Sequence, residues 1–324
     1  MAHPQKNESR LRELRRRQWE DKWGGNYIPA IFANPKEAPS ISEYSILTSK
    51  KIGRGVHALS KSENWLAIFA LYNPNLWDLH EERILYPTPR VHFLQGHPRS
   101  QGEKFLALKG TLDVAERMGT LNKHPVCKIK VEKDGCVQYL PAPFPYIGDL
   151  LLLLEDRRGP YVVNWNVKDK MESFSLSSPR KEKPQTPDNK RSQNRNALER
   201  MYYQDAGIPT REISGSQIDF ELRCNLKELF CADLQLVKIP IGLQLDIELA
   251  FMSAVGTRQR ADKLCKDLAM KHGLDTEDLV HFLKQSIWHR KVRIDLFSRF
   301  LMDKPLRAEL QDPLEVHSDW FSRI

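Results

Sequence analysis

The fold of this chain depends on the stretch GDLLLLLEDRRGPYVVNWNVKDK, residues 148–170. Two apolar runs, Leu150–Leu154 and Tyr161–Val167, flank a short polar segment that contains Gly159-Pro160. This pattern is typical of two strands joined by a tight turn. Five consecutive leucines also exceed what a solvent-facing strand carries. We therefore expect a buried β-hairpin within a larger sheet.

Polar side chains mark both ends of this hairpin. Asp149 precedes the first apolar run, and Asn166 and Lys168 end the second. Symmetric pairing about the turn predicts that Asp149 lies opposite Lys168. Asn166 and Lys168 share one face, because strand side chains alternate with a period of two. These residues form either a charged rim that adds little stability or part of a reactive site.

The same residues carry the groups that phosphodiester hydrolysis requires. That reaction uses a divalent metal held by carboxylates and carbonyls, an attacking water and a nearby cation. Asp149 is the candidate metal ligand, with the Val167 carbonyl and the Asn166 side chain completing the shell. Lys168 is the candidate to orient or deprotonate the water. By spacing alone the pattern also arises by chance, so a purely structural role stays open.

Glu63 is the candidate for a further carboxylate. Residues 60–63, Ser-Lys-Ser-Glu, fit a capping box, in which the glutamate bonds back to the start of a helix. The helix dipole also favours negative charge there. Both roles are compatible, since a residue fixed at a helix start can project into a site at a sheet edge.

Helical and strand patterns alternate around the hairpin, which predicts an α/β fold with a mixed sheet and flanking helices. Asp78, Glu81 and Glu82 are interpreted as a solvated acidic face. The polar residues 173–195 predict a mobile surface insertion. The other expected elements are a helix within 57–75, a strand within 76–87, strands at 126–131 and 137–140 joined by a turn at 133–135, a helix capped by Asn196 and ended by Gly207, and a strand at 210–214.

From about Ile218 the pattern becomes helical. TRQRADKLCKDLAMKHG (257–273) and LDTEDLVHFLKQSIWHRK (274–291) predict two helices that meet at Gly273, and KVRIDLF (291–297) predicts a strand. A helix-turn-helix with a wing fits this order, and an ordinary small helical domain fits it nearly as well.

Composition limits the classes of function. The chain has 50 Lys and Arg against 42 Asp and Glu, a net charge of +8 that favours a polyanionic partner. Residues 1–23 predict a basic arm or short helix that lies on phosphates, or a solvated terminus. Five cysteines without metal or redox spacing indicate reduced thiols. The absence of long apolar runs predicts a soluble, cytoplasmic protein with no membrane partner.

Several familiar reaction classes are disfavoured. The chain has no phosphate-binding glycine loop, dinucleotide fingerprint or serine nucleophile elbow, which argues against an ATPase, a hydride-transfer enzyme and an acyl hydrolase. The histidines of the first half show no metal-ligand spacing, so we assign them no metal. They are His57, His80, His92, His97 and His124.

Six ordered segments resemble the TnsA endonuclease subunit of heteromeric Tn-seven-type transposases. Their order and spacing make the resemblance more specific than any one motif. They are GGNYIP (24–29), GRGVHALSKSEN (53–64), LWDLHEERILYP (76–87), NKHPV (122–126), GDLLLLLEDRRGPYVVNWNVK (148–168) and LERMYYQDAGIPTREIS (198–214).

The resemblance implies a restriction-endonuclease-like domain over residues 24–217 and a helical, winged-helix-like domain over 218–324. It implies a Mg²⁺-dependent enzyme, with Mn²⁺ as a substitute, that cuts the 5′-end strand at transposon ends. The implied partners are DNA, a TnsB-type DDE transposase and a TnsC-type AAA+ ATPase. The catalytic positions of the family fall on Glu63, Asp149 and Lys168.

Asn166 departs from the family pattern, which has Gln there, or Glu in wider relatives. Asparagine withdraws the amide oxygen by one methylene, so a metal contact could be lost. Two other functions therefore stay open: a catalytically silent DNA-binding adaptor that bridges TnsB and TnsC, and a restriction or repair nuclease of the same fold. A restriction or repair nuclease would cut DNA without partners.

Overall fold

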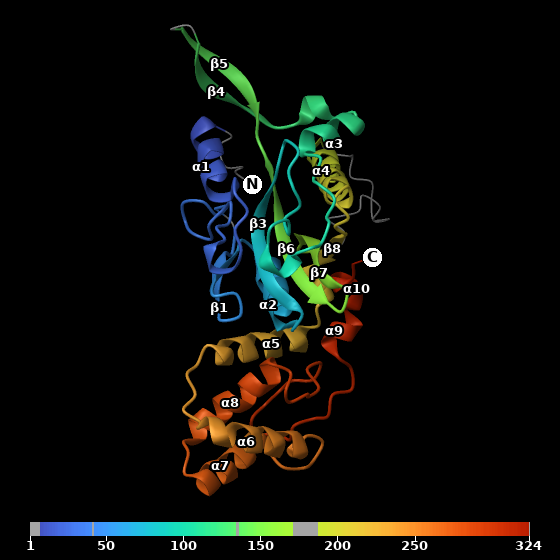
Figure 1. Cartoon of the computed structure of the whole chain (residues 1–324). Helices are drawn as coiled ribbons and strands as arrows, with labels where there is room; N and C mark the ends of the chain where they lie inside the picture. Colours follow the sequence, from blue (N-terminus) through green and yellow to red (C-terminus); the bar gives the residue numbers. More distant parts are fainter. Residues whose placement is uncertain (1–6, 41, 134–135, 171–186, 324) are drawn as a thin grey trace.

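A four-stranded mixed sheet forms the centre of the molecule (Figure 1). The computed structural model describes residues 7–40, 42–133, 136–170 and 187–323. In the sheet, β3 (Leu76–Leu85), β6 (Tyr146–Asp156) and β7 (Gly159–Lys168) are antiparallel neighbours, and β8 (Thr210–Ser214) pairs with β7 in parallel. The predicted mixed α/β fold is confirmed, and the hairpin occupies the two central strands.

The five leucines of β6 are buried on both faces of the sheet. Leu150, Leu152 and Leu154 pack in the core that contains helix α2 (Lys61–Tyr72). Leu151 and Leu153 pack in a second core with helix α4 (Pro187–Gln204). A strand covered on both faces is stabilised by an apolar residue at every position, because burial of each leucine contributes about 1.5–3 kcal/mol to the free energy of folding. This explains the absence of polar alternation.

The register of the hairpin differs from the prediction. Asp156 pairs with Gly159 and Leu150 with Trp165, so the turn consists of two residues only. Gly159 adopts φ +97°, which glycine tolerates and other residues rarely do. The register places Asp149 level with Asn166. The expectation that Asp149 lies opposite Lys168 was wrong by two residues, because the turn is tighter than the symmetric estimate assumed.

Helix α2 begins as the sequence predicts and is held close to the end of the sheet. Ser60 is its N-cap, and the Ser60 Oγ accepts the N–H of Glu63. Ser62, in the first turn of the helix, donates to Asp169 Oδ1 at 2.8 Å, just beyond β7. Gly215, in the short helix η5 (Gly215–Gln217), lies against Ser62 so closely that a Cβ there would sit 2.8 Å from the Ser62 Cβ.

Helix α4 begins well before the predicted cap. It spans Pro187–Gln204, so Asn196 lies inside the helix and is 6% exposed. The predicted insertion at 173–195 thus ends in helix from Pro187 onward, and residues 171–186 lie outside the described part of the chain. Proline is favoured in the first helical turn, a signal that the polar composition of this segment obscured.

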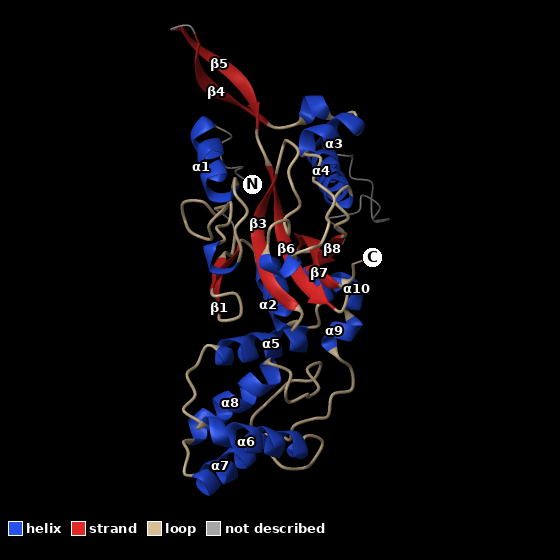
Figure 2. Ribbon diagram, in the orientation of Figure 1, coloured by secondary structure: helices blue, strands red, loops and turns tan. Residues whose placement is uncertain are grey.

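Two small antiparallel pairs flank the central sheet (Figure 2). The strands β1 (Ser45–Ser49) and β2 (Arg54–Ala58) precede α2. The strands β4 (Val126–Lys133) and β5 (Cys136–Pro143), both predicted, form a ribbon that projects beyond the body and leads into β6. Helix α3 (Thr111–Arg117) lies near the base of this ribbon.

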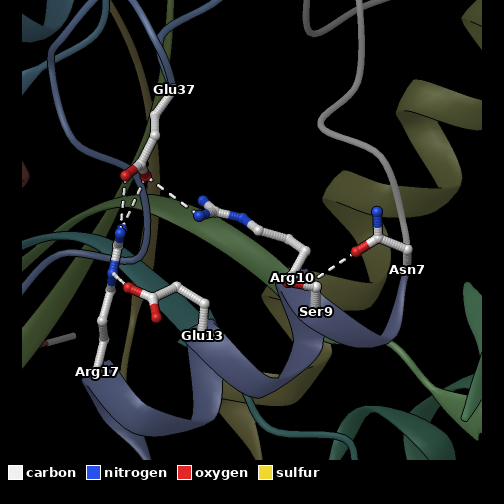
Figure 3. Close-up of a pocket in the computed structure, with 6 residues that line it drawn as sticks. All are labelled: Asn7, Ser9, Arg10, Glu13, Arg17 and Glu37. Atoms are coloured by element: carbon white, nitrogen blue, oxygen red, sulfur yellow. Dashed lines mark hydrogen bonds and ion pairs between the residues drawn. The ribbon is translucent and has the colours of Figure 1, made fainter. Parts of the chain in front are cut away.

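The basic N-terminal segment includes a packed helix. Helix α1 (Glu8–Gln18) buries Leu11 and Leu14. Arg10 and Arg17 turn toward Glu37 (Figure 3), at 3.2 Å and 2.7 Å respectively. These two arginines therefore have a structural role, which neither the phosphate-binding arm nor the solvated terminus suggested by the sequence includes.

Four helices dominate the C-terminal region, as the sequence pattern indicates. They are α5 (Phe220–Asp233), α6 (Ile241–Ala254), α7 (Ala261–His272) and α8 (Thr276–Trp288). Gly273 ends α7 with a left-handed conformation, φ +66°. The predicted strand 291–297 was wrong: Val292, Ile294 and Leu296 alternate and are buried, yet this segment forms a single β-bridge, Ile294 to Ala308.

The chain then returns to the central sheet. Two short helices, α9 (Pro313–Val316) and α10 (Ser318–Phe321), pack beside β7. The Trp165 indole N–H donates to the Trp320 carbonyl at 2.7 Å, and the Tyr161 hydroxyl donates to the Phe321 carbonyl at 3.1 Å. One apolar core therefore continues from the sheet and α2 into the C-terminal helices.

Gly215→Ala tests whether the close approach of Ser62 holds α2 in place. The new Cβ would lie 2.3 Å from the Ser62 Oγ and 3.0 Å from its Cα, so we expect a loss of about 1–3 kcal/mol in the free energy of unfolding. Urea denaturation measures this change. Gly242→Ala is the control, because a Cβ at Gly242 meets nothing within 4 Å. Equal stability of the two variants would contradict the prediction.

Candidate functional site

Asp149 joins β6 to β7 where their backbone pairing ends. The last pair of the ladder is Leu150 with Trp165. Immediately beyond it, Asp149 Oδ2 accepts the N–H of Val167 at 2.7 Å. Asp149 is partly exposed, whereas the leucines that follow it are buried. A carboxylate thus replaces a backbone acceptor at the open end of the central strands.

Asn166 and Lys168 follow on β7, and alternation places both on the face of the sheet that α4 covers. Asn166 is 2% exposed and donates from Nδ2 to Asn196 Oδ1 of α4 at 3.3 Å. Its amide oxygen is buried and accepts no hydrogen bond from any described residue. Lys168 is partly exposed at the end of the strand. The Asn166 oxygen is therefore a buried acceptor without a hydrogen bond from the described residues.

Glu63 reaches the same region from the start of α2. Its Oε1 accepts the Ser60 hydroxyl at 3.0 Å and its Oε2 accepts the N–H of Leu59 at 2.6 Å. The capping role predicted for Glu63 is confirmed, with Leu59 rather than Ser60 supplying the backbone donor. Both carboxylate oxygens are held in place by these bonds.

The structure brings Glu63, Asp149 and Lys168 into one electrostatic environment. Burial and the charge of Asp149 raise the pKa of Glu63 to about 7, and Lys168 acts in the opposite direction. Like and opposite charges shift a pKa in this way when they lie near the titrating group. Asp149 and Lys168, which the sequence selected from another segment, therefore lie near enough to Glu63 to act on its charge.

Glu82 is a member of the site that sequence reasoning missed. It lies level with Asp149, between the pairs Glu81–Leu150 and Arg83–Gly148, and is 5% exposed. Its φ is +50°, which is uncommon for a residue other than glycine. Burial and the negative charges of Glu63 and Asp149 raise the pKa of Glu82 well above its usual range.

Glu199 is the second missed residue and comes from α4. Its Oε1 accepts the Asn164 side-chain N–H at 3.0 Å. Gly148 makes room for it, since a Cβ at Gly148 would lie 3.1 Å from the same oxygen. Burial and the charge of Asp149 raise the pKa of Glu199 to about 7. A lone acidic residue beside the apolar LERMYY run was the available sequence signal.

We name Glu63, Glu82, Asp149 and Glu199 the carboxylate cluster. Arg195 of α4 lies close enough to this cluster to lower the pKa values of Glu82 and Glu199. Its guanidinium donates to the Ile147 carbonyl at 2.6 Å. Burial and mutual repulsion thus raise the pKa of Glu63, Glu82 and Glu199 and favour their protonated forms unless positive charge lies nearby.

The interpretation of Asp78, Glu81 and Glu82 as a solvated face was wrong. Asp78 and Glu81 have no exposed surface. The Asp78 carboxylate accepts the Gly24 N–H and contacts His80, whereas Glu81 forms a salt bridge with Arg54 at 2.7 Å. Partners distant in sequence neutralise these charges, which a local charge pattern cannot reveal.

The oxygen atoms of this site fit a hard divalent cation. Such cations bind carboxylates, amide oxygens and backbone carbonyls, and the unpartnered Asn166 oxygen lies next to Asp149 in register. No three His, Cys, Asp or Glu side chains in the described part of the chain form a metal-binding group. The carboxylate cluster is therefore not arranged as a group of three metal ligands, and the predicted set pairs two of its members, Glu63 and Asp149, with the neutral oxygens of Asn166 and Val167.

The remaining sequence assignments have structural explanations. The His57 ring accepts the Ala33 N–H at Nδ1, 3.0 Å away, and the His57 backbone N–H donates to Glu81 Oε1, so this residue supports the fold near the site. Within the described residues, no helix combines the length and the apolar character that crossing a bilayer requires.

Comparisons with known proteins assign the chain to no family. No protein-family model matches the sequence, and a search of curated proteins returns no significant match.

Glu199→Gln tests the electrostatics of the cluster. In the folded protein Glu199 has a pKa of about 7, against about 4.5 when unfolded, so the folded state binds more protons between these values. Wild-type stability should therefore fall as pH rises from about 4.5 to about 7. The variant lacks this effect, and its advantage over wild type should be larger at pH 8 than at pH 5, by up to about 3 kcal/mol.

Chemical denaturation of both proteins across this pH range measures the difference. Glutamine retains the oxygen that accepts from Asn164, so the hydrogen bond is kept in the variant. A stability difference that is the same at both pH values would show that Glu199 does not carry the shifted pKa.

Proposed function

We propose that this protein is a Mg²⁺-dependent DNA endonuclease with a restriction-endonuclease-like fold. Its role would be that of a TnsA-like subunit, which cuts the 5′-end strand at transposon ends beside a TnsB-type transposase and a TnsC-type ATPase. The observation that carries the proposal is the pairing of Asp149 with the Val167 N–H beside Lys168, close to the Glu63 carboxyl.

The electrostatics of the site support this activity. Glu63 and Glu199 have pKa values near 7, so they exchange protons readily at neutral pH. A divalent cation would favour the ionised form of these carboxyls and relieve their mutual repulsion. The site is partly exposed at Asp149 and Lys168, which leaves a path for a phosphodiester.

In this proposal each residue has a defined task. Glu63 and Asp149 would hold the metal with their carboxylates, and the Asn166 amide and Val167 carbonyl would supply neutral oxygens. The metal would polarise the scissile phosphate and lower the pKa of a bound water. Lys168 would orient that water and hold positive charge near the phosphate oxygens. The Val167 N–H fixes the Asp149 carboxylate in its orientation.

An adaptor without catalytic activity is the second candidate. Asn166 favours it, because the side chain bonds to Asn196 of α4 and is shorter than the glutamine that the resemblance implies at this position. Such a subunit would keep the fold, bind DNA and bridge its partners. Cleavage assays separate the two candidates.

Asp149→Ala and Lys168→Ala should each abolish 5′-strand cutting, with a loss of at least about a thousand-fold in rate. Assembly with the TnsB-type partner should be unchanged. The assay is cleavage of an end-labelled transposon end in the presence of that partner and Mg²⁺. Asp113→Ala and Lys104→Ala, at exposed positions far along the sequence from the site, are the matched controls. Cutting by Asp149→Ala protein would refute the assignment.

Asn166→Leu tests the buried amide oxygen. The substitution preserves the shape of the side chain but removes the oxygen, so we expect half-maximal cleavage to need about ten times more Mg²⁺. Asn196→Leu is the control, because it breaks the same Asn166–Asn196 bond and leaves the Asn166 oxygen in place. If both variants show the same Mg²⁺ dependence, Asn166 does not bind the metal.

A further inference from the structure

The β4–β5 ribbon projects from the body of the molecule (Figures 1 and 2). Its base is buried: Cys127 and its cross-strand partner Ala142 are 4% and 5% exposed. Its outer part is open, with Val137 51% exposed and Tyr139 65% exposed. A two-stranded ribbon gains little stability by itself. A long, solvated ribbon of this kind is therefore suited to contact another molecule.

One face of the ribbon combines basic and aromatic side chains. Lys128 pairs with Pro141 and Lys130 with Tyr139, so alternation places these four side chains on the same face. All four are exposed. No ion pair found among the described residues involves either lysine. Glu132, level with Val137, is the acidic residue of this face. We call it the ribbon face.

The ribbon is connected directly to the strand that carries Asp149. β5 ends at Pro143 and β6 begins at Tyr146, with two residues between them. Tyr139 and Asp149 are thus ten residues apart, at most about 33 Å in an extended chain. This distance corresponds to about ten base pairs of duplex DNA. The ribbon face therefore lies within one helical turn of duplex DNA from Asp149.

We propose that the ribbon face binds the backbone of duplex DNA beside the cleavage position. The two lysines would contact phosphates, and Tyr139 would pack against the sugar-phosphate surface. β-Ribbons bind DNA in this manner because their width matches a groove. The inference rests on the proposed function in taking DNA as the ligand, and it adds a second contact that orients the duplex.

The edge of the ribbon disfavours a protein strand as the occupant. Strand addition requires free backbone groups along an edge. The Lys130 N–H on β4 already donates to Glu8 Oε2 of α1 at 3.0 Å. The lysine side chains also oppose the pairing of a further strand. The charge of the face thus favours a polyanion, and on the β4 edge the Lys130 N–H is already taken.

The test compares DNA binding by wild-type protein and by the Lys128→Ala/Lys130→Ala variant. Fluorescence anisotropy with a labelled duplex, in EDTA and between about 50 and 200 mM salt, gives affinity and salt dependence. Loss of two phosphate contacts should weaken binding about ten-fold and reduce the slope of log K against log salt by about 2. Lys128→Arg/Lys130→Arg should restore wild-type binding.

Lys104→Ala/Lys227→Ala is the control, since it removes the same charge from exposed positions outside the ribbon. Equal weakening in both alanine variants would overturn the inference by showing a general charge effect. Unchanged binding in the ribbon variant would also overturn it and would indicate a protein partner. The binding assay contains EDTA and is therefore independent of cutting. If the ribbon variant binds DNA more weakly but the wild-type protein shows no cleavage with Mg²⁺, the proposed function is refuted and this inference stands.

Discussion

The hydrogen bond from the Val167 N–H to Asp149 controls the arrangement of the candidate site. The β6–β7 ladder ends at the pair Leu150–Trp165, and this bond joins the two strands immediately beyond that pair. The buried leucine strand fixes Asp149 from one side, and the two-residue turn fixes the register from the other. As a result, Asn166 and Lys168 come to the face where α4 supplies its polar residues. A different turn length would separate these groups.

Electrostatic repulsion is the second constraint on this region. The carboxylate cluster draws one member from α2, one from β3, one from β6 and one from α4. Desolvation raises the free energy of each charge, and each charge disfavours its neighbours. Arg195 and Lys168 offset part of this cost. Burying these four carboxyl groups costs stability that leucine or alanine at the same positions would not cost, so packing alone does not account for them.

The sequence predicted those parts of the fold that depend on local patterns. The hairpin, the Ser60 cap and the end of α7 at Gly273 all follow from neighbours within a few residues. The sequence did not indicate the burial of Asp78 and Glu81, because Gly24 and Arg54, which neutralise them, come from other segments. Residues 291–297 have the alternation of a strand, but no partner strand lies beside them in the described structure. The Glu63, Asp149 and Lys168 site was predicted through motif order, whereas Glu82 and Glu199 required three-dimensional proximity.

Glu82 shows how contacts outside the site orient one of its side chains. Its left-handed conformation suits glycine or asparagine, and a glutamate there costs on the order of 1 kcal/mol. The Glu82 carbonyl accepts the Ala30 N–H and the Gln18 side chain, each at 3.0 Å, and these bonds hold the unusual conformation. The side chain is therefore aimed by segments near the N-terminus that never enter the site. Loss of the Gln18 side chain would therefore act at a distance, by rotating a carboxylate rather than by removing one.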